Sequence, residues 1–350
     1  MSEPAANSPV ISPKHPYPPS WIDRLIAWID NLPISAFVFY AIVFFLTALL
    51  SNIILWLDGT LPLGSIDPLE TSASIVIIYW LALYHYLTRV GSVALRSFRP
   101  LLDADDSEVA KLDYELATLP RSLGRWAIIL GLFLQAATIL GDPASFGNPA
   151  NAYYFAGNII FLTFVMFTFF ALVIRSIRQL RMVSGLHDRA TNLYLLDLAP
   201  AHAFAAFTSR AGIGIILILI IGYVYQPNAS FNSALDVFLY IAISMLAIVI
   251  FVGPLAGMRA RLEDAKDRAL SEVNTLLRTA TERLHRKISD DDSKNIREAT
   301  AAISSLVAER DLLQKTSTWP WDTRTLRGFA STLLLPIFLL LFSQFIERFF

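Results

Sequence analysis

The stretch SAFVFYAIVFFLTALLSNIILWL, residues 35–57, decides the fold, because it contains no charged side chain. A helix rises about 1.5 Å per residue and the hydrocarbon core of a bilayer is about 30 Å thick, so about 20 apolar residues suffice to cross it. Inside the bilayer every backbone N–H and C=O group must be paired within the protein, and a helix achieves this alone. This stretch therefore predicts a transmembrane helix.

Six more apolar stretches of this kind occur along the chain, at residues 71–88, 123–140, 155–174, 206–225, 236–253 and 329–346. The stretch that starts at 206 reaches the required length only if Arg210 extends its side chain to the membrane interface. The composition agrees, since 16% of the residues are charged, whereas soluble proteins average about 25%. We predict an all-α, polytopic membrane helix bundle of about seven transmembrane helices.

The distribution of positive charge predicts the orientation of these helices. The chain has 28 Lys and Arg residues, and seven spans place all of them except Arg348 on one side of the membrane. Cytoplasmic loops of membrane proteins are enriched in Lys and Arg in this way. We therefore expect a multi-pass protein of the plasma (cell inner) membrane, with its N-terminus in the cytoplasm and its C-terminus outside.

Composition divides the chain into four regions. They are a proline-rich disordered tail, six spans joined by amphipathic loop helices, a cytoplasmic helical hairpin, and an interfacial tryptophan segment with the seventh span, at residues 1–20, 21–257, 258–318 and 319–350 respectively. One loop helix is predicted to start near Ser107. The helix that begins at Trp21 is amphipathic, which fits either a helix in the headgroup layer or a lead-in to the first span.

The predicted hairpin carries an apolar stripe on each of its two helices. On the first helix the stripe follows an eleven-residue repeat through Leu262, Ala265, Ala269, Val273, Leu276, Ala280 and Leu284. After a turn and helix cap at Asp290 to Ser293, the stripe continues through Ile296, Ala299, Ile303, Leu306 and Leu313. These faces pack on each other, on other helices of the chain, or on a second copy, so a homo-oligomer through residues 258–318 is an open alternative.

Two stretches near the C-terminus carry a resemblance to known sequences. They are Glu309–Lys315 leading into Thr318-Trp319-Pro320-Trp321, and the tail from Leu326 to Phe350. Both resemble the C-terminal end of uncharacterised bacterial multi-pass membrane proteins. The resemblance implies a prokaryotic membrane, and it brings no catalytic or binding residue with it.

Motifs that would identify a chemistry are missing from the sequence. The chain contains no cysteine, and its five histidines form no metal-ligand pair such as His-x-x-x-His. It also lacks the glycine-rich loops that bind phosphates and the serine nucleophile motif of hydrolases. We therefore expect no catalytic residue, no metal site and no cofactor, and the charge pattern gives no indication of nucleic-acid binding.

Polar residues inside or at the ends of the spans are the remaining candidates for a binding site. Ionisable groups in a bilayer are costly and usually functional, whereas amides commonly bond one helix to another. The candidates are His85, Gln135, Asn158, Arg125 and Arg210. Three further arginines continue the fourth helix and fit either binding of anionic lipid headgroups or a basic collar required by topology alone, namely Arg175, Arg178 and Arg181.

Three functions fit this sequence. The first is a non-enzymatic membrane scaffold or signal-coupling protein, which presents its cytoplasmic helices to a partner or to copies of itself and has membrane lipid as its other partner. The alternative is a homo-oligomeric ion channel or transporter lined by polar positions of the spans. The third is a lipid-acting membrane enzyme that would use His187, Asp188 and His202, a cluster without recognised geometry. Short segments on the outer side and a large inner hairpin favour the first.

Overall fold

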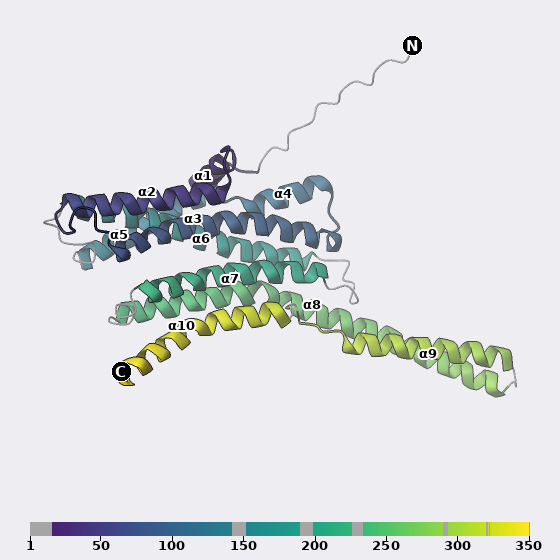
Figure 1. Ribbon diagram of the computed structural model, residues 1–350. Helices are drawn as coiled ribbons and strands as arrows, with labels where there is room; N and C mark the ends of the chain where they lie inside the picture. Colours follow the sequence, from purple (N-terminus) through teal and green to yellow (C-terminus); the bar gives the residue numbers. More distant parts are fainter. Residues whose placement is uncertain are drawn as a thin grey trace, which may run out of the picture. The chain divides into compact units, whose positions relative to one another are not determined.

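The protein is an all-α membrane helix bundle, as the sequence predicts (Figure 1). The computed structural model describes residues 16–141, 152–189, 199–225, 234–289, 293–319, 321 and 323–349. The helices over these residues are α1 (Trp21–Asp30), α2 (Ala36–Leu57), α3 (Pro68–Phe98), the 3-10 helix η1 (Arg99–Leu101), α4 (Asp106–Ala117), α5 (Arg121–Gly141), α6 (Ala152–Asp188), α7 (Ala199–Tyr225), α8 (Ala234–Ser289), α9 (Ser293–Lys315) and α10 (Thr323–Phe349).

Six of these helices are long and apolar enough to cross a membrane within the part of the chain that the structure describes, namely α2, α3, α5, α6, α7 and α8. They contain the first six predicted spans. The seventh predicted span, residues 329–346, lies within α10, which has 27 residues. Most side chains beyond Leu335 lie outside the described residues, so the membrane crossing of α10 stays a prediction.

Three of the helices extend well beyond the bilayer-length stretches that predicted them. For example, α3 continues from Thr88 to Phe98, and Ala94, Leu95 and Phe98 on this continuation are buried at 4%, 1% and 0% exposure. Similarly, α6 continues to Asp188, and α8 continues from its apolar part into the first helix of the predicted hairpin without interruption. Apolar contacts within the protein therefore stabilise these helices beyond the length that is needed to cross a bilayer.

The chain divides into two compact units, which we describe separately. Unit 1 comprises residues 1–92 and 104–177, and unit 2 comprises residues 93–103 and 178–350. Within unit 1, α1 is held at its start by a capping box between Ser20 and Asp23. Its apolar residues Ile22, Ile26 and Ile29 are buried at 0%, 5% and 1% exposure. These three isoleucines are therefore covered by protein, whereas Trp28 on the same helix is 54% exposed, and the position of α1 relative to the headgroup layer stays a prediction.

The segment before α1 is fixed against the start of α5. The Ser20 N–H donates to the Leu119 carbonyl at 2.9 Å, and the Arg121 N–H donates to the Pro18 carbonyl at 3.1 Å. Gly124 permits this close approach, because a Cβ there would lie 2.7 Å from the Ser20 Cβ. The last residues of the predicted tail thus belong to the folded unit, whereas residues 1–15 lie outside the described residues.

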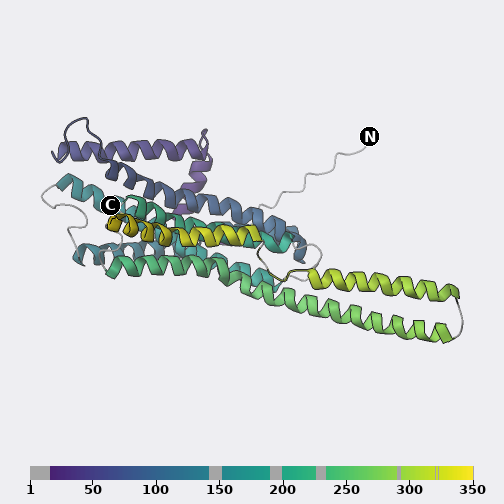
Figure 2. The ribbon, with the colours of Figure 1, turned by 60° about the horizontal axis from the view of Figure 1, so that its bottom comes forward.

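Unit 2 is organised around α7 and the long helix α8. α7 packs against both α8 and α10, and α9 packs along the second part of α8 (Figures 1 and 2). Gly212 of α7 sits at the crossing, where a Cβ would lie 2.7 Å from the Phe329 ring and 3.1 Å from the Ala247 carbonyl oxygen. Phe329 in turn stacks on Phe251 at a centroid distance of 4.0 Å. Small and aromatic side chains together set the spacing of these three helices.

Candidate functional site

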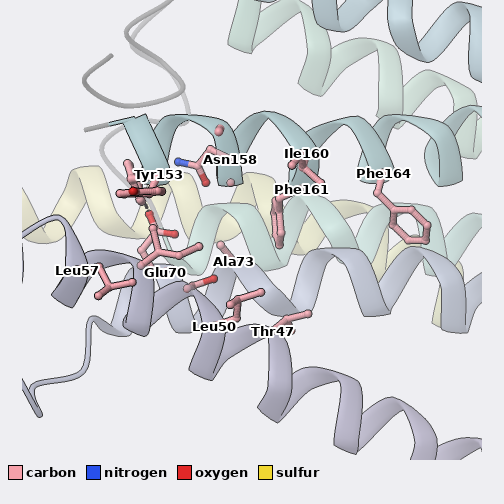
Figure 3. A pocket seen from close by; sticks show the side chains of 15 residues that line it. Thr47, Leu50, Leu57, Glu70, Ala73, Tyr153, Asn158, Ile160, Phe161 and Phe164 are labelled. Carbon is pink, nitrogen blue, oxygen red and sulfur yellow. Dashed lines mark hydrogen bonds between the residues drawn. The ribbon is translucent and has the colours of Figure 1, made fainter. Parts of the chain in front are cut away.

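An apolar groove runs between α2, the start of α3 and the start of α6 in unit 1 (Figure 3). We call it the α2–α6 groove. Its volume is about 590 Å³, which lies within the range of roughly 300–1,000 Å³ for ligand sites. The lining residues are Thr47, Leu50, Ser51, Ile54, Leu57, Glu70, Ala73, Tyr153, Tyr154, Ala156, Gly157, Asn158, Ile160, Phe161 and Phe164. Hydrophobic side chains form most of its walls.

One end of the groove is polar. The Tyr154 hydroxyl donates a hydrogen bond to Glu70 Oε1, and the Asn158 side chain bonds the same hydroxyl. The Tyr154 backbone N–H donates to Asp58 Oδ2 at 2.9 Å. These bonds join the start of α6 to the end of α2 and the start of α3. The Glu70 carboxylate is thereby held at the groove end, as Figure 3 shows.

A second set of bonds fixes α2 against the start of α3 behind this end. The Asp67 N–H donates to Asn52 Oδ1 at 2.8 Å. The Asn52 amide donates to the Ala48 carbonyl at 2.8 Å and to Thr71 Oγ1 at 3.1 Å. Asn52 is 4% exposed, and its amide oxygen gives the Asp67 N–H, which precedes α3, an acceptor. The groove therefore has a fixed polar end.

A separate buried polar cluster ties α1 to α3 and α6 in unit 1. The Tyr84 hydroxyl donates to Asp23 Oδ1 at 2.8 Å. The Arg175 guanidinium lies 4.2 Å from the centroid of the Tyr84 ring, and its Nη1 donates to Thr88 Oγ1 at 2.7 Å. Among the residues that the structure describes, the Nε and Nη2 atoms of Arg175 have no hydrogen-bond partner. The cation–π contact with Tyr84 and the hydrogen bond to Thr88 therefore hold the Arg175 guanidinium inside unit 1.

His85 belongs to a neighbouring network at the same end of α3. One ring nitrogen, Nε2, lies 3.1 Å from Asp30 Oδ1, and Nδ1 lies 3.1 Å from the Tyr40 hydroxyl. Arg89 Nη2 donates to the same Asp30 oxygen at 2.6 Å. His85 is 3% exposed. Both ring nitrogens are therefore engaged, and the imidazole bridges α1 and α2.

The five predicted binding residues do not form one site. Asn158 lines the α2–α6 groove, and His85 lies in the network with Asp30. Gln135 is 5% exposed, and its Nε2 has no hydrogen-bond partner within the described part of the chain. Arg125 and Arg210 are exposed. The five polar residues that the sequence identifies therefore lie in separate parts of the structure.

The three arginines of α6 have different surroundings. Arg175 is 2% exposed, so the interpretation of this residue as a ligand of lipid headgroups is wrong. Arg181 is exposed, and Arg178 is partly exposed. Their lipid contacts stay predictions. A count of basic residues on one side of a membrane cannot separate an arginine that faces the protein interior from one that faces the headgroups.

The residues that sequence reasoning missed are the partners of the polar residues. Glu70 is 84 positions from Tyr154, and Asp23 is 61 positions from Tyr84. For Asp23 one signal was available, since Ser20 with an acid three residues later is the pattern of a capping box. No local pattern identifies Glu70 as part of a groove. The carboxylate of a first helical turn is most often explained by the helix dipole alone.

Neither a metal centre nor a known relative identifies the site. Among the residues the structure describes, no group of three or more His, Asp or Glu side chains is arranged to hold a metal ion. The side chains of His187 and Asp188, considered above for an enzyme, lie outside the described residues. No protein-family model, curated protein or solved structure matches the chain.

Proposed function

We propose that the protein is a non-enzymatic membrane scaffold or signal-coupling protein that presents the helical hairpin α8–α9 for association with a partner or with a second copy. The observation that carries the proposal is the continuity of α8. This helix has 56 residues, which corresponds to about 84 Å at 1.5 Å per residue. Its first part is apolar enough to cross a membrane, and its second part is charged. One continuous helix thus links the apolar part to the hairpin.

The base of the hairpin is tied to α8 by specific contacts. Lys266 Nζ donates to the Gln314 carbonyl at 2.8 Å and to the Thr316 carbonyl at 2.7 Å. The Arg259 guanidinium lies 4.2 Å from the centroid of the Trp319 ring. These contacts hold the C-terminal end of α9 and the segment after it against α8. A displacement of α8 is therefore transmitted to both.

The hairpin also exposes apolar side chains for a partner. Val273 and Leu313 are buried between the two helices, at 4% and 6% exposure, whereas Leu276 and Leu312 are 49% and 57% exposed. Leu276 was predicted to belong to the packed stripe, and the structure leaves half of it uncovered. These two leucines are the apolar side chains that we expect a partner helix to cover.

The positive charge of the chain supports an orientation for the proposed scaffold. The hairpin, residues 258–318, contains 12 of the 28 Lys and Arg residues, and the N-terminal region contains Lys14 and Arg24, an enrichment that is typical of the cytoplasmic side. We place both in the cytoplasm of a bacterial inner membrane, with α10 as the seventh span leading to an outside C-terminus. The outer loops are then too short to form a ligand domain.

The test of this proposal is the oligomeric state of the full-length protein in mild detergent, measured by light scattering after gel filtration. We expect an oligomer that dissociates when Leu276→Asp and Leu312→Asp are combined. Asn274→Asp adds one of these charges at an exposed polar position of the same helix and leaves the oligomer intact. A monomeric starting protein, or an oligomer that survives the double substitution, contradicts self-association through the hairpin.

A further inference from the structure

The α2–α6 groove is lined along its length by apolar side chains from α2 and α6. Leu50 and Leu57 on the α2 wall are 57% and 72% exposed, and Ile160 on the α6 wall is 72% exposed. These side chains are uncovered by the protein and line a concave surface (Figure 3). An apolar chain laid along the groove would contact all three. A polar molecule would leave them without matching partners.

The length of the groove corresponds to one leaflet of a membrane. It extends along α2 from Leu57 to Thr47 and along α6 from Tyr153 to Phe164, or about 15–17 Å at 1.5 Å per residue. This is about half of the 30 Å hydrocarbon core. The polar end with Glu70 lies at the C-terminal end of α2 and the starts of α3 and α6, and we expect these helix ends at the bilayer interface. A chain in the groove therefore reaches from the interface to the middle of the membrane.

The charge at the polar end selects the head of the ligand. Residues 25–88 and 126–174, which form the whole groove, contain no Lys or Arg. Glu70, Asp58 and the neighbouring Asp67 are acidic, and Glu70 Oε1 already accepts the Tyr154 hydroxyl. An anionic head is repelled by these carboxylates, whereas an ammonium group donates a charge-assisted hydrogen bond to a carboxylate such as that of Glu70.

We propose that the α2–α6 groove binds an amphiphile with one apolar chain and a protonated primary amine head, the chain lying between α2 and α6 and the amine on Glu70. Ordinary bilayer lipids would also place tails against these walls, but without a preference for the head. Selectivity for the amine therefore separates a binding site from a lipid-facing surface. The substitutions that test it remove the carboxylate or fill the groove.

The experiment uses the full-length protein in phosphatidylcholine nanodiscs and octadecylamine with a nitroxide on its chain. The alcohol and the carboxylic acid of the same chain length are the comparison probes. Electron paramagnetic resonance measures the immobilised fraction of each. We expect roughly tenfold tighter binding of the amine than of the alcohol, as one charge-assisted hydrogen bond would give, and still weaker binding of the acid.

Glu70→Gln is expected to remove the preference for the amine. Ala156→Trp fills the groove from an exposed position and is expected to weaken the amine and the alcohol alike. The matched controls are Glu272→Gln on the hairpin and Ala136→Trp on a lipid-facing position of α5, and both should bind as the unchanged protein does. Because Ala156 is exposed, this variant tests the site even if Glu70→Gln fails to fold.

Equal binding of amine and alcohol, or an amine preference that survives Glu70→Gln, overturns the proposal and leaves only an ordinary lipid contact. A spin-labelled phosphatidylethanolamine carries the same amine on two chains, and we expect the groove to retain it less than octadecylamine. Equal retention of the two probes contradicts a ligand with one apolar chain.

Discussion

Replacing Asp23 by alanine would leave several donors without an acceptor in unit 1. The Asp23 carboxylate accepts the Tyr84 hydroxyl at 2.8 Å, the Leu119 N–H at 2.9 Å and the Ser20 hydroxyl at 2.5 Å. Tyr84, Leu119 and Ser20 are all at 0% exposure. Water cannot replace the carboxylate at these positions without opening the contact between α1, α3 and the start of α5.

The magnitude follows from these bonds. An unsatisfied buried donor costs about 1–3 kcal/mol, and the loss of the capping box costs about 1 kcal/mol. Because the groups touch one another their contributions do not simply add, and we expect Asp23→Ala to lower the free energy of unfolding by about 3–5 kcal/mol. Tyr84→Phe removes one donor and leaves Asp23 its other partners, so about 1–2 kcal/mol is expected.

The assay is equilibrium denaturation in mixed micelles, followed by circular dichroism. The double variant combines Asp23→Ala with Tyr84→Phe, so no Tyr84 hydroxyl remains to lose its acceptor. Its loss of unfolding free energy should therefore be smaller than the sum of the two single losses by about 1 kcal/mol or more. Arg24→Ala on the exposed side of α1 is the control, with an effect within about 0.5 kcal/mol. If Asp23→Ala lowers the free energy of unfolding by less than about 1 kcal/mol, or if its effect adds strictly to that of Tyr84→Phe, the Asp23 cluster does not hold α1 in place.

Three further predictions concern unit 2 and the orientation of the chain. Gly212→Ala should destabilise the protein in thermal denaturation, because overpacking against the Ala247 carbonyl and Phe329 costs about 1–3 kcal/mol. In the control Gly257→Ala a Cβ meets nothing within 4 Å, so this variant should only gain up to about 1 kcal/mol from helix propensity. Equal melting temperatures of the two variants would contradict the tight crossing at Gly212. Lys266→Met should accelerate hydrogen exchange in the last turn of α9 relative to Lys111→Met, and unchanged exchange would show that the lysine does not hold that end. Because the chain has no cysteine, Leu63→Cys and Asn274→Cys each provide a single thiol: an impermeant maleimide should label the first in intact cells and the second only after lysis, and the reverse pattern would invert the proposed orientation.

The apolar spans were predictable because the signal lies in consecutive residues. The stretch 35–57 differs from α2 by a single residue at its start, since Ser35 is the N-cap and its hydroxyl accepts the Val38 N–H. The lengths of α3 and α6 were not predictable from the bilayer thickness. Their continuations depend on packing partners far away in the sequence.

The candidate site was only half predictable for the same reason. Asn158 is visible as an amide in an apolar stretch, yet the groove it lines also needs Glu70 and the wall of α2, which a local pattern does not bring together. Arg175 shows the opposite error. As one basic residue among many it fits a collar, and only the position of Tyr84 above its guanidinium shows that it is part of the interior.

Because α8 is continuous, a tilt of its apolar part also moves the hairpin. From Met258 to Ser289 the helix measures about 48 Å, so a tilt of about 10° in the apolar part would move the hairpin tip by about 8 Å at this length. Pro254 lies just before this arm and has no N–H to donate to the Ile250 carbonyl, which lowers the resistance to bending there. Small rearrangements among α7, α8 and α10 would thus become displacements large enough for a binding partner to detect.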